Sequence, residues 1–187
     1  PDMLFEQVVE VNERVMLIGD EDLIPHGYNA KICPVIDHES GQRFRVLETP
    51  NLNRIRQELQ VLKQQGIESI AVVLLHSYIY PQHEKQIGQV AKELGFVNVS
   101  LSHEVMPMIR AVPRGNTTCV DAYLTPILRE YVRSFCAGFK NNLQGVNVTF
   151  MQSDGGLTPA DQFMGCRAIL SGPAGGVVGA AATAYDP

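Results

Sequence analysis

The sequence predicts an α/β protein, and three observations support this prediction. Two apolar runs, Ile70–Leu75 and Val97–Leu101, have the length and continuity of strands that are covered on both faces. A stretch with apolar residues at three- and four-residue steps precedes each run, as expected for a helix. Helices and strands that alternate at this spacing form a parallel layer with right-handed crossovers. We therefore expect helix, strand, helix and strand in the middle of the chain.

Composition limits the classes of function. The 187 residues are 45% hydrophobic and 19% charged, which is ordinary for a globular protein. The net charge of −5 argues against a nucleic-acid partner, since such surfaces are basic. No apolar run is long enough to cross a bilayer, so we expect no membrane partner. The four cysteines are widely spaced, which indicates free thiols in a cytoplasmic, reducing compartment.

The first third of the chain predicts extended structure. Residues 4–17 alternate in stretches and indicate an extended segment. Residues 18–48 contain Gly, Pro, Asp and Asn at the density of loops, with short strands expected near Lys31–Ile36 and Arg43–Leu47.

The helices of the α/β layer have recognisable ends. Thr49 and Pro50 can begin the first helix, because proline lacks the amide that has no partner there. Gly66 suits its C-terminal cap. Pro81 begins the second helix and Gly95 ends it.

The second half predicts a loop, a long helix and smaller elements. Residues 103–116 are polar and proline-rich, and Thr117–Lys140 has one apolar side that predicts a helix. Pro126 either kinks that helix or begins a new one. The remaining expected elements are a strand at Val146–Met151, a turn at 153–156, an extended piece at Arg167–Leu170 and a helix at Gly172–Ala182.

Histidines and acidic residues are the first candidates for a site. His76 leaves the carboxyl end of a predicted strand, where open α/β sheets bind ligands. It is either a ligand contact or a loop histidine bonded to a neighbouring carbonyl. His83-Glu84 and His103-Glu104 are metal-competent types but adjacent pairs, unlike the HExxH spacing, so we expect structural roles and no metal site.

Two further segments could contact an anion. Arg110 and Arg114 lie on the predicted proline- and glycine-rich loop; the sequence leaves open whether Arg114 holds a carboxylate or phosphate, and it favours a plain exposed loop for Arg110. Asn116 or Thr117 would cap the following helix in that alternative. Ser153 and Asp154 precede two glycines, and they form either a tight turn or the edge of a ligand cleft.

The glycine-rich segment Ser171–Ala182 matches neither common phosphate-binding motif. It lacks the Gly-Lys-Ser/Thr of a Walker loop, and its glycine spacing differs from GxGxxG. A Gly-rich turn before a helix could still bind an anion. The small side chains better suit a helix that crosses another helix at short distance, as at a hinge between two lobes. The candidate residues are Ser171, Gly172, Gly175, Gly176 and Gly179.

Five segments, in order, resemble the hydantoinase/5-oxoprolinase family. They are AVVLLHSYIYPQHE at 71–84, VSLSHEVMPMIR at 99–110, RGNTTCVDAYLTP at 114–126, MQSDGGL at 151–157 and ILSGPAGGVVGAA at 169–181. The segments PDMLFEQVVEVNERV, PHGYN and FRVLETPN are most similar to the members that act on 5-oxoproline.

This resemblance implies ribonuclease-H-like lobes of the actin, sugar-kinase and heat-shock ATPase superfamily, incomplete in an internal fragment. Residues 1–112 would end the family's N-terminal region, and residues 113–187 would begin its hydantoinase A domain. The parent protein would use ATP and Mg²⁺ to hydrolyse 5-oxo-L-proline to L-glutamate in the glutathione cycle, as a cytosolic homodimer.

The resemblance assigns no catalytic base or nucleophile to this chain. Both phosphate loops of the superfamily would lie outside it, so we expect the fragment alone to be inactive. The alternatives are an ATP-dependent N-methylhydantoinase, an acetone-carboxylase-type relative, or a non-catalytic α/β module.

Overall fold

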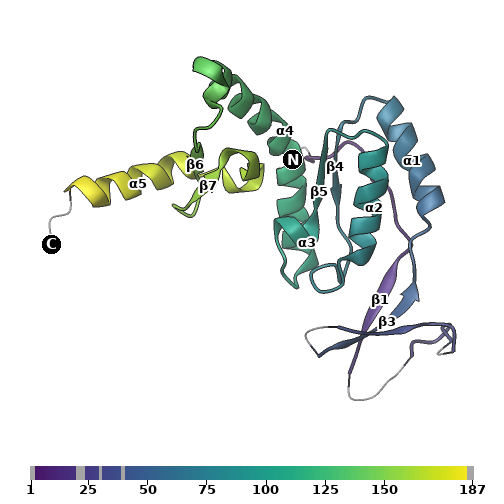
Figure 1. Ribbon diagram of the computed structural model, residues 1–187. Helices are drawn as coiled ribbons and strands as arrows, with labels where there is room; N and C mark the ends of the chain where they lie inside the picture. Colours follow the sequence, from purple (N-terminus) through teal and green to yellow (C-terminus); the bar gives the residue numbers. More distant parts are fainter. Residues whose placement is uncertain (1–2, 20–23, 30, 39–40, 185–187) are drawn as a thin grey trace.

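The computed structural model describes residues 3–19, 24–29, 31–38 and 41–184 (Figure 1). A small antiparallel sheet lies at one end, an α/β unit lies in the middle, and a hairpin with a terminal helix projects from the other side. The mixed α/β class predicted from the sequence is confirmed.

The antiparallel sheet has the strand order β1-β3-β2. Its strands are β1 (Arg14–Ile18), β2 (Val35–Asp37) and β3 (Arg43–Glu48). Val15, Phe44 and Val46 form its buried core, and Ile79 and Tyr80 of the α/β unit pack against them. The expected extended segment becomes a regular strand only from Arg14 onward, and the expected second strand begins at Val35 instead of Lys31.

The middle unit has the predicted alternation of helices and strands. It consists of α1 (Leu52–Gln64), β4 (Ser69–Val72), α2 (Gln82–Glu93) and β5 (Asn98–Leu101). The two strands pair in parallel, with Ser69 opposite Asn98 and Val72 opposite Leu101. Asn51 caps α1 by accepting a hydrogen bond from the Arg54 amide at 3.1 Å, so the helix begins after the predicted Thr49-Pro50 start. Gly66 follows the last turn of α1 and has a φ of 90°, as expected at a helix C-terminus.

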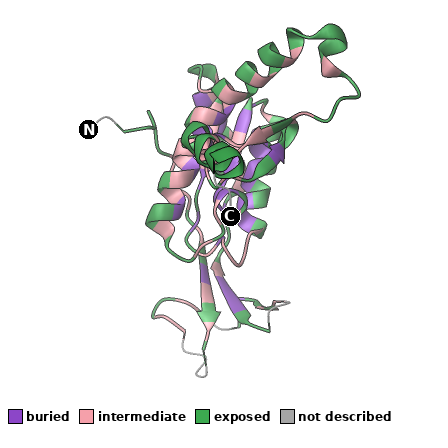
Figure 2. Ribbon diagram, turned by 90° about the vertical axis from the view of Figure 1, so that its left-hand side faces the viewer, coloured by how far each residue is buried: buried purple, intermediate pink, exposed green. Residues whose placement is uncertain are grey.

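Helices pack on both faces of β4. The buried residues, purple in Figure 2, lie mainly in this middle unit and in the strands next to it. Val72 and Leu74 point into the main core, where they meet apolar residues of α1 and α2. The opposite face of β4 meets the long helix α4 (Ala111–Ala137), to which Ser69 donates a hydrogen bond. The main core consists of Ile55, Leu59, Leu62, Val72, Leu74, Ile87, Val90, Ala91, Phe96 and Leu101.

Helix α4 begins earlier than the sequence predicted. The expected loop at 103–116 is wrong over most of its length, because α3 (Ser102–Val105) occupies its start and α4 begins at Ala111. Pro113 is tolerated because it lies in the first turn of α4, where no intrahelical amide bond is needed. Neither Asn116 nor Thr117 is the N-cap; that position is Arg110, whose side chain makes no capping bond.

Pro126 lies inside α4, which continues through it. A proline at this position removes the amide that would bond the carbonyl four residues earlier, at Ala122. The Ser69 hydroxyl of β4 donates to that carbonyl at 2.5 Å. The sheet therefore supplies the hydrogen bond that the proline removes, and the helix does not end.

The last quarter of the chain forms small elements that project from the α/β unit. Three short 3₁₀ helices, at Lys140–Leu143, Ala160–Gln162 and Gly165–Arg167, flank the hairpin of β6 (Thr149–Met151) and β7 (Leu157–Pro159). The extended piece expected at Arg167–Leu170 is wrong, because Gly165–Arg167 forms a 3₁₀ turn and residues 168–170 continue as turns. Helix α5 (Ser171–Ala184) confirms the expected final helix and has no buried residue. Across the described ranges, the helices are all too short or too polar for a membrane span.

Candidate functional site

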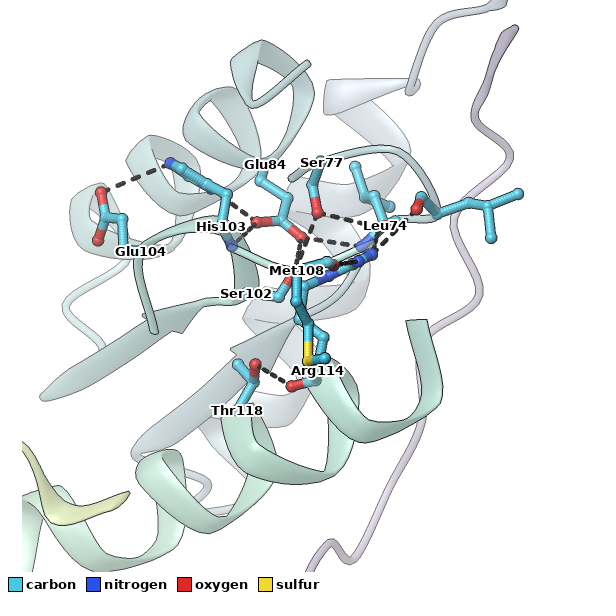
Figure 3. A network of polar contacts seen from close by, with 10 residues as sticks. Leu74, Ser77, Glu84, Ser102, His103, Glu104, Met108, Arg114 and Thr118 are labelled. Carbon is cyan, nitrogen blue, oxygen red and sulfur yellow. Dashed lines mark hydrogen bonds and ion pairs between the residues drawn. The ribbon is translucent and has the colours of Figure 1, made fainter. Parts of the chain in front are cut away.

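The carboxyl ends of β4 and β5 meet in a buried network of polar side chains (Figure 3). The network joins the loop after β4, the first turn of α2, the start of α3 and the first turns of α4. This edge is where open α/β sheets bind ligands. Of the predicted site residues, Arg114 belongs to this network. His76 lies next to it.

Glu84 is the anionic centre of this network. It lies in the first turn of α2 and is completely buried. Its Oε1 accepts from the Leu74 amide at 2.8 Å and from the Ser102 hydroxyl at 2.7 Å. Its Oε2 accepts from the His103 amide at 3.1 Å and lies 2.7 Å from the Nδ1 of the same residue. Four hydrogen bonds make burial of an ionised carboxylate tolerable.

Arg114 is the cationic centre, and it is also completely buried. Its Nε donates to Ser102 at 3.0 Å. One terminal nitrogen donates to the carbonyls of Leu74 and Leu75 at 2.5 and 3.0 Å, and the other donates to Met108 and Ile109 at 2.5 and 3.5 Å. The guanidinium has five N–H groups, and these contacts use all of them.

This geometry favours the structural alternative for Arg114. It lies on a helix rather than on the predicted loop, and it has no donor left for a substrate carboxylate or a phosphate. Burial lowers the pKa of the guanidinium, while the nearby Glu84 and Tyr78 raise it. Arg110, by contrast, is exposed, as the sequence analysis favoured.

Ser102 connects the two charges. Its hydroxyl accepts from Arg114 and donates to Glu84, so the cation and the anion are coupled through one oxygen. The Ser77 hydroxyl lies 2.9 Å from that of Ser102 and 3.0 Å from the Leu74 carbonyl. The network therefore fixes the path of the chain where it leaves both parallel strands.

His76 lies on the loop that this network holds. Its Nδ1 is buried and has no hydrogen-bond partner among the described residues, so the carbonyl-bonded alternative is not seen for that atom. Burial lowers the pKa of the imidazole, with Glu13 raising it and Arg114 and Arg14 lowering it. A neutral imidazole with an unpartnered nitrogen can accept or donate one hydrogen bond to a ligand.

The other two candidate histidines, His83 and His103, have structural partners. His83 Nδ1 lies 2.7 Å from a carboxylate oxygen of Glu13, and both side chains are buried. His103 bonds Glu84, and its Nε2 lies 3.7 Å from Glu104. Within the described ranges, no three His, Cys, Asp or Glu side chains are grouped to hold a metal ion.

Ser153 and Asp154 lie in a different place, in the turn of the β6–β7 hairpin. The Ser153 hydroxyl donates to the Arg167 carbonyl at 2.7 Å and accepts from the Leu170 amide at 3.0 Å. Asp154 accepts from the Gly156 amide at 2.9 Å. These bonds form the tight turn and hold it against the chain that leads into α5.

The glycine face of α5 is open in the described part of the chain. A Cβ added at Gly172, Gly176 or Gly179 would meet nothing within 4 Å, and one at Gly175 would lie 3.7 Å from Met151 Cγ. Ser171 begins the helix. The expected close helix crossing is therefore not made by any residue that the structure describes, and it remains a proposal for a contact with other parts of a longer protein.

The sequence did not reveal the centre of the network. Glu84 was considered only as part of an adjacent His-Glu pair with a structural role, and Ser102 and the Leu74 backbone were not singled out. One signal was available: Ser102 follows the second apolar run directly, as His76 closely follows the first. Polar residues that leave neighbouring parallel strands meet at one edge.

Two family models match the chain. The hydantoinase/oxoprolinase N-terminal region matches residues 1–95, and hydantoinase/oxoprolinase matches residues 114–186. A 5-oxoprolinase from Dictyostelium discoideum is 48% identical over 179 residues, which are 96% of this chain. The chain spans only 14% of the length of that relative.

Two solved structures share the fold. An ATP-dependent caprolactamase from Pseudomonas jessenii matches 75% of this chain and 21% of its own, with a TM-score of 0.62 and 30% identity. A nucleotide-free acetone carboxylase matches 91% of this chain and 21% of its own, with the same TM-score of 0.62 but 24% identity.

Proposed function

Because this chain belongs to the hydantoinase/oxoprolinase family, we propose that it is part of an ATP-dependent 5-oxoprolinase. The whole protein opens the lactam ring of 5-oxo-L-proline to give L-glutamate and cleaves ATP in doing so. One observation supports this most strongly: a 5-oxoprolinase is 48% identical over 96% of the chain.

The structural relatives support the same class of reaction. The caprolactamase acts, by its name, on a lactam with ATP, and a lactam is a cyclic amide like 5-oxoproline. The ring nitrogen of such an amide is a poor leaving group, so the amide is hydrolysed slowly by water alone. Transfer of a phosphoryl group from ATP to the carbonyl oxygen makes the carbonyl carbon more electrophilic, so that water adds to it. The C–N bond of the adduct then breaks, with a proton going to the nitrogen, and a second water hydrolyses the remaining acyl phosphate to carboxylate and inorganic phosphate.

The described residues do not by themselves fit a magnesium–ATP site. They hold no cluster of three metal-ligating side chains, and the sequence contains no Walker loop. We therefore propose that ATP and Mg²⁺ are bound mainly by other parts of the whole protein. The hinge role of Ser171, Gly172, Gly175, Gly176 and Gly179 beside a nucleotide cleft belongs to the same proposal.

Several finer points follow from family membership. We propose ribonuclease-H-like lobes of the actin and sugar-kinase type, with the domain boundary after residue 112. That position falls in the first turn of α4. We further propose that the whole protein is a cytosolic homodimer that acts in the glutathione cycle.

The assay for the function is phosphate release by the full-length protein with ATP and Mg²⁺. We expect 5-oxo-L-proline to stimulate release more than hydantoin, N-methylhydantoin or caprolactam, and more than acetone with bicarbonate. Preferential stimulation by a hydantoin would assign the chain to the hydantoinase alternative, and by acetone to the carboxylase alternative. Release that none of them stimulates would support the non-catalytic module.

His76 is the residue of this chain that we propose as a ligand contact. Changing His76 to alanine in the full-length enzyme should lower kcat/KM for 5-oxoproline by about tenfold, as expected when one hydrogen bond to a bound group is lost. Steady-state phosphate release measures this. Gln60→Ala, an exposed change on α1, is the control. Unchanged kinetics with an unchanged melting temperature would remove His76 from the site.

A further inference from the structure

The backbone of His76 is held in place, whereas the Nδ1 of its ring has no hydrogen-bond partner among the described residues. The His76 carbonyl accepts from the amides of Ile79 and Tyr80 at 3.1 and 2.9 Å, in the loop after β4. A fixed backbone that carries an unpartnered ring nitrogen is the arrangement expected of a preorganised ligand contact.

The residues on either side of His76 are bonded to the buried network (Figure 3). The preceding residue, Leu75, accepts from Arg114 through its carbonyl at 3.0 Å. The following residue is Ser77, whose hydroxyl lies 2.9 Å from that of Ser102. The network therefore controls where the loop places His76, and it does so through the chain on both sides of that residue.

Ser102 joins these contacts through one oxygen atom. Its hydroxyl oxygen accepts from Arg114 Nε at 3.0 Å, and its single proton goes to Glu84 Oε1 at 2.7 Å. Because it has no second proton, Ser102 can only accept in its contact with Ser77. The oxygen thus has three partners, and the side chain is completely buried. Removing it would take one hydrogen bond from each of the three.

We propose that Ser102 is a positioning residue for the reaction, which sets the place of His76 through Ser77 and through Arg114, whose guanidinium it holds. This proposal rests on the proposed function, in which His76 contacts the bound ligand. A small displacement of a contacting group weakens its interaction, because a hydrogen bond depends on distance and angle. Loss of the Ser102 hydroxyl should therefore affect the reaction through His76.

A double-mutant cycle in the full-length enzyme tests this coupling, with 5-oxoproline-stimulated phosphate release as the assay. Ser102→Ala alone should lower kcat/KM by about fivefold. In the His76→Ala background the same change should lower it by less than about twofold, because the contact that Ser102 positions is already absent. The loss in Ser102→Ala should also fall on the same parameter, kcat or KM, as the loss in His76→Ala.

Ser100→Ala is the matched control, because it deletes another buried hydroxyl of β5 that donates to a carboxylate, that of Asp121, at 2.7 Å. The other hydroxyl contact of Ser100 is with Asn98, at the opposite end of β5 from the loop that bears His76. The control should lower the melting temperature about as much as Ser102→Ala does, and keep kcat/KM within about twofold of wild type.

Equal factors in the two backgrounds would show that Ser102 acts independently of His76, and would overturn the proposal. Normal kinetics of Ser102→Ala or of His76→Ala would overturn it too, as would an equal kinetic loss in Ser100→Ala. If the Ser102→Ala protein does not fold, Ser77→Ala takes its place. That change removes a contact of the same oxygen and leaves both buried charges paired, so the same coupling to His76 is expected.

The proposed function fails on a different result, which is a wild-type protein that 5-oxoproline does not stimulate. The cycle is then run with the hydantoin, lactam or ketone that does stimulate phosphate release, and it decides the role of Ser102 alone. A full-length protein that none of these compounds stimulates would overturn both proposals.

Discussion

Replacing Arg114 with alanine is expected to lower the free energy of opening of the α/β unit by about 3–5 kcal/mol, the usual cost of removing one partner of a buried charge pair. The change leaves Glu84 buried without its cation. It also removes the donors of four carbonyls, on Leu74, Leu75, Met108 and Ile109. Hydrogen exchange of β4 and α4 amides in the full-length protein measures the loss.

Arg110→Ala is the matched control, because Arg110 is exposed four residues earlier on the same chain segment. It should change the opening free energy by less than about 0.5 kcal/mol. Arg114→Lys should recover little, since a single ammonium cannot reach the same set of carbonyls as the planar fork. An Arg114→Ala protein with normal stability but a raised KM for 5-oxoproline would restore the ligand-contact hypothesis.

Changing Gly165 to alanine is expected to destabilise the junction between α4 and the hairpin by about 3 kcal/mol, the upper part of the range for overpacking. A Cβ there would lie 2.6 Å from both the Leu124 Cβ and the Thr125 amide nitrogen. The Thr125 amide nitrogen is part of the helix backbone, so it cannot move aside as the end of a flexible side chain can. The clash would also disturb the bond from the Gly165 amide to the Thr125 hydroxyl, at 2.9 Å.

Limited proteolysis of the full-length protein reports this loss, with faster cleavage expected between residues 138 and 170. Gly19→Ala is the control, because a Cβ at Gly19 meets nothing within 4 Å. Equal cleavage of the Gly165→Ala and wild-type proteins would show that the junction between α4 and the 3₁₀ turn accommodates the Cβ without losing stability, which would contradict this prediction.

The α/β unit could be predicted because its signals are local. The apolar run at 70–75, the periodic helices and Gly66 each depend on neighbouring residues, and the structure confirms the elements they predict. The start of α4 could not be predicted in this way. Arg114 is helical because carbonyls of the loop after β4 and of the chain before α4 surround its guanidinium, and Pro126 is tolerated because Ser69 replaces its lost bond.

The sequence predicted which candidate residues approach one edge of the sheet, but it did not predict the surroundings of each side chain. His76 follows β4 as expected, whereas Arg114, for which ligand binding was one of two open alternatives, has its charge fully used inside the protein. Sequence spacing shows which residues approach one edge. It does not show burial, and burial decides whether an arginine meets a ligand or a set of backbone carbonyls.

The most direct test of the account is the ratio of products formed by the full-length protein from 5-oxo-L-proline, ATP and Mg²⁺. We expect L-glutamate and inorganic phosphate to appear in equal amounts, and no glutamate to form without ATP, because phosphorylation of the lactam oxygen precedes ring opening. Glutamate formed without ATP, or phosphate released under 5-oxoproline without glutamate, would contradict the assignment to an ATP-dependent 5-oxoprolinase.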